Sequence, residues 1–510
     1  MPLKPADYEG IFRSRPRLSQ EREAQVKGSV LEPVVSESAS ENGNAGSSSP
    51  VVTEASKEKG PLTNIENWTR KQGHTVTFVG LFIFTAILYF RPYETIPALS
   101  SFTSMAFYSG IITLVIFVIT QLSLEGNLTA RPREVNLALL LGLAALLSIP
   151  LAINPGEAWQ TFNDHLLKAL VIFIVIVNVV RTEVRLKLLI LLALAVSIYL
   201  SIHAVNDYRL GMFRIGSEKT ARIAGSIAGL FHNSNDLALH LVTMVPIAFT
   251  LGLANRSVVR KMFFYATTIL MIGAVIVTSS RGGFLGLIAA ILVLLHKLGR
   301  RNKTVAAATV ALGVVLFLVM APATYSGRLA SMFTSEASAS QRTAILKRSI
   351  VVALRYPLFG VGVGNFHYRS IHELESHNAY TQVATEMGIG AMVAYILFMV
   401  HPLRKLRLIE RELFDSRSQR HFYYLAIGLQ TSLIAYMVAS FFASVAYQWY
   451  VYYLVGYAIA LRRIYYEREL QQSPLEGTGI KVNSGRGNLD TSYEISEREQ
   501  VSEHKPSVSE

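Results

Sequence analysis

The segment from Arg355 to Gly390 reads RYPLFGVGVGNFHYRSIHELESHNAYTQVATEMGIG, and it joins three features around which the rest of the chain is organised. A turn rich in glycine, residues 356–366, comes first, and a short polar stretch with two histidines and two glutamates follows. A hydrophobic helix is predicted to begin near Ala379, directly after His377. The pattern therefore places a titratable imidazole at the mouth of a membrane helix, within reach of both water and lipid.

The composition is that of a membrane protein. Hydrophobic residues make up 51% of the 510 positions and charged residues 16%, which is below the quarter usual for soluble proteins. Apolar runs recur at roughly the 20-residue length that crosses a bilayer as a helix. Cysteine is absent, which excludes disulfides and thiolate metal sites. The net charge of +13 is explained by basic cytoplasmic loops and predicts no nucleic-acid partner.

The predicted fold is all-α, a polytopic membrane bundle of about 12 transmembrane helices spanning residues 73–463. The flanking segments, 1–72 and 464–510, are too polar to bury an apolar core and are predicted to be disordered cytoplasmic tails. Residues 1–72 show no cleavable signal peptide, so the first apolar run is expected to act as the anchor. The predicted spans lie near residues 75–91, 103–122, 135–152, 166–181, 187–205, 236–254, 262–279, 283–298, 304–322, 379–401, 422–443 and 446–462.

The charges of the loops predict the orientation. One set of alternate loops is rich in lysine and arginine, and Arg462 and Arg463 follow the last predicted span. Basic loops face the cytoplasm, so both termini are predicted to be cytoplasmic. The largest of the other loops, near residues 323–378, is then predicted to face outward.

Three predicted outward segments carry arginine against this pattern: Arg222 in residues 206–235, Arg281 in the turn at 279–283, and Arg342 in the long loop. Most such charges are explained by solvation or by reaching toward lipid headgroups. Arg281 differs, because its polar turn is too short to carry the guanidinium far from the membrane. A planar guanidinium suits phosphate oxygens, so we expect a lipid phosphate or pyrophosphate as its ligand.

A helix with a basic face is predicted inside the long loop, at residues 340–355. Its apolar residues fall near helical spacing opposite Arg342, Lys347 and Arg348. Two placements remain open: the helix lies on the membrane surface, or it packs on the ends of the spans.

Four pieces of the sequence, in order, resemble motifs of the O-antigen ligase and O-antigen polymerase family. They are GLFHNSN (229–235), TSSRGG (278–283), YPLFGVGVGNF (356–366), and His377-Asn378 followed by Gly388-Ile-Gly390. Ala391 stands where some members have Gly, Thr or Tyr. The resemblance covers roughly residues 75–462 and is strongest at 229–390.

The resemblance implies a metal-independent glycosyltransferase without a cofactor, in the cytoplasmic (inner) membrane of a bacterium and with its active site on the periplasmic face. The family transfers a glycan from undecaprenyl pyrophosphate to a lipid A–core sugar or to another lipid-linked repeat, in lipopolysaccharide or exopolysaccharide biosynthesis. Carried over residue by residue, His377 is the catalytic base, and Arg281, Arg222 and, more weakly, Arg342 bind the pyrophosphate. Asn378 and Asn235 are candidates for binding substrate. Partners would be the two glycans, the bilayer and other polysaccharide assembly proteins.

Plainer interpretations of the same residues stay open. His377 can cap the following helix, and Asn233 and Asn235 can cap a span. The polar stretch can be a metal site formed by His372, Glu373, Glu375 and His377, although its spacing matches no metal motif. The glycines at 360–364 more simply permit a tight turn than bind a dinucleotide.

The function itself also has alternatives. A transporter or flippase for the same lipid, and a non-catalytic scaffold that binds headgroups, compete with the transferase. If the protein is a transferase, these motifs do not separate a ligase from a polymerase, because both share them. The long tails slightly favour a polymerase.

Overall fold

A computed structural model describes residues 73–96, 99–212, 214–215, 221–223, 231, 233–299, 336–414 and 419–472. The predicted N-terminal tail, the predicted span at 304–322 and the C-terminal tail beyond 472 lie outside the described residues.

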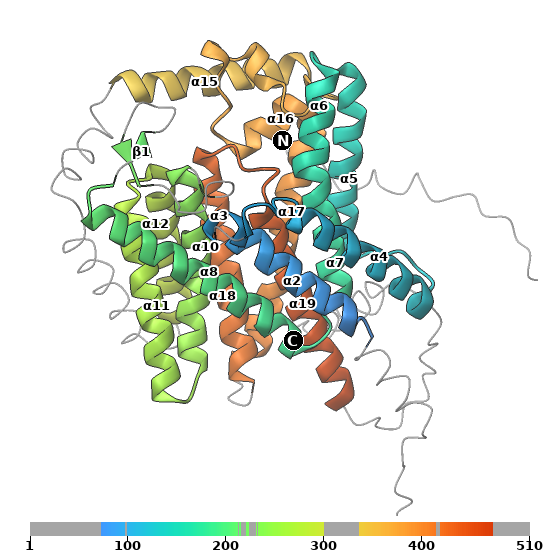
Figure 1. Ribbon diagram of the computed structural model, residues 1–510, viewed down its shortest axis with the longest axis vertical. Helices are drawn as coiled ribbons and strands as arrows, with labels where there is room; N and C mark the ends of the chain where they lie inside the picture. Colours follow the sequence, from blue (N-terminus) through green and yellow to red (C-terminus); the bar gives the residue numbers. More distant parts are fainter. Residues whose placement is uncertain are drawn as a thin grey trace, which may run out of the picture. The chain divides into compact units, whose positions relative to one another are not determined.

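The described part of the chain is helical apart from one pair of two-residue strands (Figure 1). The longer helices are α2 (Thr75–Phe90), α4 (Met105–Glu125), α5 (Arg133–Ser148), α7 (Lys168–Val179), α8 (Glu183–Arg209), α10 (Ser234–Ala254), α11 (Val258–Val277), α12 (Arg281–Gly299), α15 (Glu336–Arg355), α17 (Ile389–Glu412), α18 (Arg420–Ala439) and α19 (Trp449–Gln472). The short elements are α3 (Pro92–Thr95), η2 (Ile149–Leu151), α6 (Pro155–Thr161), η3 (Phe162–Leu167), η4 (Phe366–Arg369), η5 (Ile371–Glu373), α16 (Ala379–Met387) and η6 (Ser440–Phe442). The strands β1 (Arg214–Ile215) and β2 (Ala221–Arg222) pair antiparallel.

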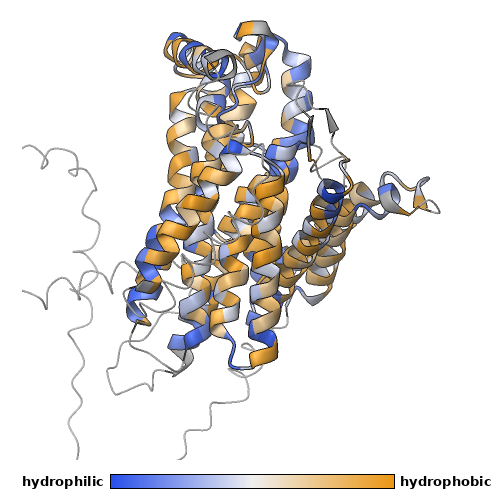
Figure 2. Ribbon diagram, turned by 90° about the vertical axis from the view of Figure 1, so that its left-hand side faces the viewer, coloured by the Kyte–Doolittle hydropathy of each residue, from blue (hydrophilic) through white to orange (hydrophobic). Residues whose placement is uncertain are grey.

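The prediction of an all-α polytopic membrane protein is confirmed. Ten of the described helices are long and apolar enough to cross a membrane. Figure 2 shows apolar residues along the middle of these helices and hydrophilic residues toward their ends. The span formed by α10 is 89% buried and that of α4 only 17%, so α10 lies at the centre of the bundle and α4 at its edge. The last helix, α19, has 24 residues, as many as α17. It ends in the polar sequence RRIYYERELQQ and is not among the ten.

The predicted single span at 379–401 is wrong, because the structure divides it into α16 and α17 at Gly388. Gly388 has φ 94 and ψ 166, which breaks the helix. The N–H group of Ile389 donates to the carbonyl of Pro357 at 2.8 Å instead of continuing the helix. A Cβ at Gly388 would lie 2.2 Å from the Leu358 carbonyl oxygen, so this contact requires glycine.

The two ends of the bundle differ in the elements that they carry. We name as the loop end the one that carries α15, α16, η6 and the turn before α12 (Figure 1). The opposite end carries Arg181, Arg185, Lys297, Arg462 and Arg463, and we name it the basic end.

Candidate functional site

The turn between α11 and α12 places Arg281 at the start of a membrane helix. Ser279 adopts φ 53 and reverses the chain, and Arg281 is the first residue of α12. The Ser280 hydroxyl accepts from the N–H of Gly283 at 3.3 Å and donates to Asn235 Oδ1 at 2.8 Å. The turn is thereby joined to the first turn of α10. A guanidinium at this position adds to the partial positive charge of the α12 N-terminus, an arrangement that favours anions.

The two glycines after Arg281 let α12 approach its neighbours closely. A Cβ at Gly283 would lie 2.5 Å from Ala238 Cβ on α10, and one at Gly282 would lie 2.8 Å from Phe442 Cβ in η6. The motif therefore fixes Arg281 where α10, α12 and η6 meet.

The glycine-rich turn at 360–364 wraps the end of α16. Its three glycines have φ of 67, 100 and 75, so the predicted tight turn is confirmed. The N–H of Val361 donates to the Thr385 carbonyl at 2.8 Å, and the N–H of Gly362 donates to the Glu386 carbonyl at 3.1 Å. Two short 3₁₀ helices follow the turn, and there is no strand–turn–helix unit of the kind that binds a dinucleotide in this described segment.

A buried carboxyl that the sequence analysis missed lies under this turn. Glu386 is 5% exposed, and its Oε2 accepts from the Tyr447 hydroxyl at 2.6 Å and from the Gly364 N–H at 2.8 Å. Burial raises the pKa of Glu386 to about 7, against the opposing effect of the Tyr447 hydrogen bond. A glutamate inside the otherwise apolar run VATEMG was the signal that could have revealed it.

His377 lies in a left-handed backbone conformation, which is uncommon for residues other than glycine. Its φ is 51, and its N–H donates to the Ser444 hydroxyl at 2.9 Å, just beyond η6. The suggestion that His377 caps the next helix is wrong, because the N-cap is Asn378. The Asn378 Oδ1 atom accepts from the N–H groups of Tyr380 and Thr381 at 2.9 and 3.0 Å. That oxygen is thus engaged in capping α16, and a contact between Asn378 and substrate stays a prediction.

An apolar groove runs down the bundle between α12, α16, α18 and η6. Its volume is about 640 Å³, and it is open along its length. The Tyr380 hydroxyl donates to the Met437 carbonyl at 2.7 Å and ties α16 to α18 at this groove. The lining side chains are Leu285, Ile288, Ala289, Leu292, Tyr380, Met437, Val438, Phe441 and Phe442.

The remaining predicted residues lie at several places. Asn235 accepts the hydrogen bond of the Ser280 hydroxyl, as described above. Asn233 is the N-cap of α10, and its Oδ1 atom accepts from the N–H of Asn235 at 2.9 Å. Arg222 is the register partner of Arg214 in the strand pair, and its side chain lies outside the described residues. Arg342 is half-buried on α15. The structure therefore joins Asn235 to the turn before Arg281, and both that turn and His377 contact η6 or the residues just after it.

The polar stretch before α16 was one candidate for a metal site. Among the described side chains, no group of three or more histidine, aspartate or glutamate residues is arranged to hold a metal ion. The side chain of His372, one of the four residues considered, lies outside this set.

A protein-family model matches part of the chain. Residues 266–396 match the family model described as O-antigen ligase. The matched segment contains Arg281, Arg342, His377 and Asn378, whereas Arg222 and Asn235 precede it. No protein of curated function matches the chain. The resemblance inferred from the sequence motifs is confirmed over this segment, where the chain is similar to the O-antigen ligase family, and the described helices are those of a multi-pass membrane protein.

Proposed function

We propose that the protein transfers or polymerises a glycan carried by undecaprenyl pyrophosphate, at the loop end of the bundle. The loop end would face the outer side of the bacterial cytoplasmic membrane, with both termini cytoplasmic, because the arginines and lysines of the basic end favour the cytoplasmic side. One observation carries the proposal: Arg281 stands at a helix N-terminus directly above an apolar groove.

The groove suits the isoprenoid chain of such a donor. Leu285 lines it one helical turn after Arg281, and Leu292 lines it eleven positions after Arg281. At a rise of about 1.5 Å per residue, the lining on α12 extends about 16 Å from the arginine along the span. A lipid pyrophosphate whose tail enters the groove would bring its phosphates to the guanidinium and to the α12 N-terminus.

The proposed reaction is a direct displacement. The imidazole of His377 accepts the proton of the acceptor hydroxyl, and the oxygen forms a bond to the anomeric carbon of the donor sugar. The bond between that carbon and the pyrophosphate oxygen breaks, and its electron pair stays on the pyrophosphate. Arg281 stabilises the negative charge that develops on the pyrophosphate. In a low-dielectric site we expect this stabilisation to contribute more to catalysis than the proton transfer does. His377 is three positions before Tyr380, which lines the groove.

The test is a transfer assay with the full-length protein in detergent, using undecaprenyl-pyrophosphate oligosaccharide and EDTA. We expect Arg281→Ala and His377→Ala to lose transfer. Two matched controls, Arg260→Ala and His296→Ala, remove exposed residues remote from the loop end and should keep it. Longer lipid-linked chains from the donor alone would identify a polymerase, and transfer that needs added lipid A–core would identify a ligase.

Equal transfer by all five proteins would overturn the assignment of Arg281 and His377. Absence of transfer with either acceptor would overturn the transferase and favour the alternative, a transporter or flippase of the lipid-linked oligosaccharide. Loss of transfer in EDTA that returns with a divalent cation would overturn metal independence while leaving the transferase in place.

A further inference from the structure

The helix α15 has two apolar faces, and only one of them packs against the protein. Ile345, Ser349 and Val352 are buried and face the small cluster that contains Val361 and Phe366. This face therefore packs on the turn after the helix and on α16, so for this face the structure favours packing, one of the two placements that the sequence left open. On the other face, Ile350, Val351 and Leu354 are 48%, 53% and 67% exposed.

The exposed stripe continues into the turn after the helix. Leu358 is 76% exposed and Phe359 is 38% exposed. Together with the three residues above they form one apolar surface, which we name the α15 stripe: Ile350, Val351, Leu354, Leu358 and Phe359. Isolated exposed apolar residues are ordinary, but a contiguous apolar stripe on one helix face is typical of a contact surface.

The position of the α15 stripe relates it to the edge of the membrane. The carbonyl of Pro357 accepts from the N–H of Ile389, the first residue of the span α17. Leu358 is thus adjacent to the end of a membrane-crossing helix, whose own residues Val393 and Leu397 are 47% and 44% exposed. Figure 1 shows α15 lying across the end of the bundle and not along it, as a helix in the plane of the interface would.

A second span end is joined to the same segment. The N–H of Ile153, in the turn between two other spans, donates to the carbonyl of Val361 at 3.1 Å. On either side of that turn, Leu151 at the end of one span and Trp159 near the start of the next are 59% and 54% exposed. An exposed tryptophan at a span end is typical of the membrane–water interface, which places the neighbouring α15 stripe at the same level.

The charge of the segment determines what kind of surface it fits. Between residues 337 and 372 there are five arginine and lysine residues and no aspartate or glutamate: Arg342, Lys347, Arg348, Arg355 and Arg369. Lys347 and Arg355 are exposed and flank the stripe. An apolar surface with exposed cations beside it complements acyl chains beneath anionic headgroups.

We propose that α15 is an interfacial membrane anchor, with the α15 stripe inserted among the acyl chains and with Lys347 and Arg355 on the headgroups of anionic phospholipids. The buried face of α15 holds Phe366, at the start of the polar segment that leads to His377. The anchor thereby sets the height of this segment above the bilayer. The membrane contact does not depend on the proposed transferase function.

The absence of cysteine makes a direct depth measurement simple. Single cysteines at Leu354 and Leu358 would carry a nitroxide label in the full chain, reconstituted in vesicles of phosphatidylethanolamine and phosphatidylglycerol. Val393→Cys on α17 is the lipid-facing control, and Gln341→Cys, exposed on another face of α15, is the water-facing control. Power saturation with oxygen and with a soluble nickel chelate then reports the depth of each label.

We expect the labels at 354 and 358 to be accessible to oxygen and shielded from nickel, as at 393, and the label at 341 to be accessible to nickel. Nickel accessibility at 354 and 358 equal to that at 341 would overturn the anchor. Dipolar broadening at 354 would also overturn it, because a second copy of the chain would then cover the stripe.

A separate experiment tests whether Lys347 and Arg355 bind anionic headgroups. Replacing phosphatidylglycerol by phosphatidylcholine should raise the nickel accessibility at 354. The same lipid exchange should have no effect in the Lys347→Glu, Arg355→Glu background. If the nickel accessibility at 354 changes neither with the lipid nor with the charge reversal, the assignment to anionic lipid is overturned.

Discussion

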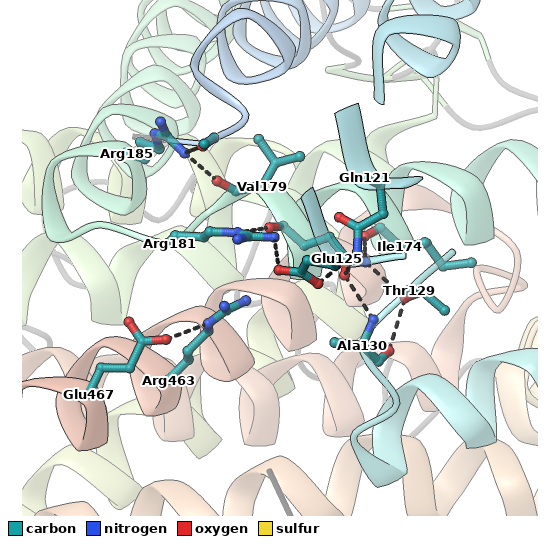
Figure 3. Close-up of polar contacts among 12 residues, drawn as sticks. Gln121, Glu125, Thr129, Ala130, Ile174, Val179, Arg181, Arg185, Arg463 and Glu467 are labelled. Atoms are coloured by element: carbon teal, nitrogen blue, oxygen red, sulfur yellow. Dashed lines mark hydrogen bonds and ion pairs between the residues drawn. The ribbon is translucent and has the colours of Figure 1, made fainter. Parts of the chain in front are cut away.

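The basic end and the loop end of the bundle are held together by different means. At the basic end, ion pairs join segments that are far apart in the sequence, and Figure 3 shows one of them, between Arg181 and Glu125. Arg181 is 4% exposed, contacts Glu125 at 2.5 Å and donates to the Asn178 carbonyl at 2.6 Å. At the loop end, backbone hydrogen bonds, a helix cap and close glycine contacts make the connections described above.

The same contrast holds for the carboxyl groups. Glu134, fully buried at the basic end, meets both terminal nitrogens of Arg462 at 2.8 and 3.3 Å and His401 Nδ1 at 3.0 Å. Glu386, equally enclosed at the loop end, has a hydroxyl and a peptide N–H as its donors. A carboxylate with a guanidinium partner stays ionised and serves structure, whereas one without such a partner titrates near neutral pH.

The largest expected effect on stability follows from breaking the pair at the basic end. Arg462→Ala leaves the Glu134 carboxylate buried without its guanidinium partner, and breaking a buried pair typically costs about 3–5 kcal/mol. Unfolding in mixed detergent micelles would measure this loss. Transfer per folded molecule should be retained, because the substitution lies at the end opposite to Arg281 and His377.

The neighbouring arginine is the matched control. Arg463 bonds Glu467 one turn along the same helix at 2.8 Å, and that glutamate is 30% exposed. Arg463→Ala should therefore cost less than about 1 kcal/mol. Equal losses for the two variants would contradict the view that burial of the partner decides the size of the effect.

At the loop end, we expect the buried carboxyl of Glu386 to make the stability of the protein depend on pH. The pKa of Glu386 rises from 4.5 to about 7 on folding, so the folded state holds its proton more tightly than the unfolded state. The associated stability is complete below pH 4.5 and is lost as the pH rises through 7, a change on the order of 3 kcal/mol. Glu386→Gln cannot titrate, so the difference in melting temperature between variant and wild type should shift in favour of the variant between pH 5 and 8.

The hydroxyl partner supplies the control. Tyr447→Phe removes a hydrogen bond that favours the ionised carboxylate, so it should raise the pKa of Glu386 further and move the loss of stability to higher pH. A movement to lower pH, or an unchanged difference between wild type and Glu386→Gln across the range, would contradict the assignment of the titration to Glu386.

The spans were predictable because about 20 consecutive apolar residues leave few alternatives. Local chemistry was predictable too: the glycines at 360–364 do form a tight turn, and Asn233 does cap α10. The break at Gly388 was not, because its cause is a distant backbone group, the Pro357 carbonyl that accepts from Ile389. The hydropathy pattern alone gives no sign of a helix break at such a position.

The candidate site divides in the same way. Residue type and position indicated Arg281 and His377, but the link between Ser280 and Asn235 joins two helices that no spacing rule connects. The groove and the exposed face of α15 were equally out of reach, because both depend on which helices become neighbours. Glu386 was overlooked because a lone glutamate in an apolar run acquires its meaning from the turn that buries it.

The smallest of the expected effects separates the two roles of Asn378. Asn378→Ala removes the cap of α16 and should cost about 1 kcal/mol, as cap substitutions do. Asn378→Asp keeps an oxygen for the N–H groups of Tyr380 and Thr381, so it should keep the stability. If the side chain acts as a cap alone, the aspartate variant should also keep wild-type transfer. A stable Asn378→Asp protein with a raised KM would instead mean that the amide nitrogen contacts substrate, and the loop end would then join structure and function in one residue, as the basic end does not.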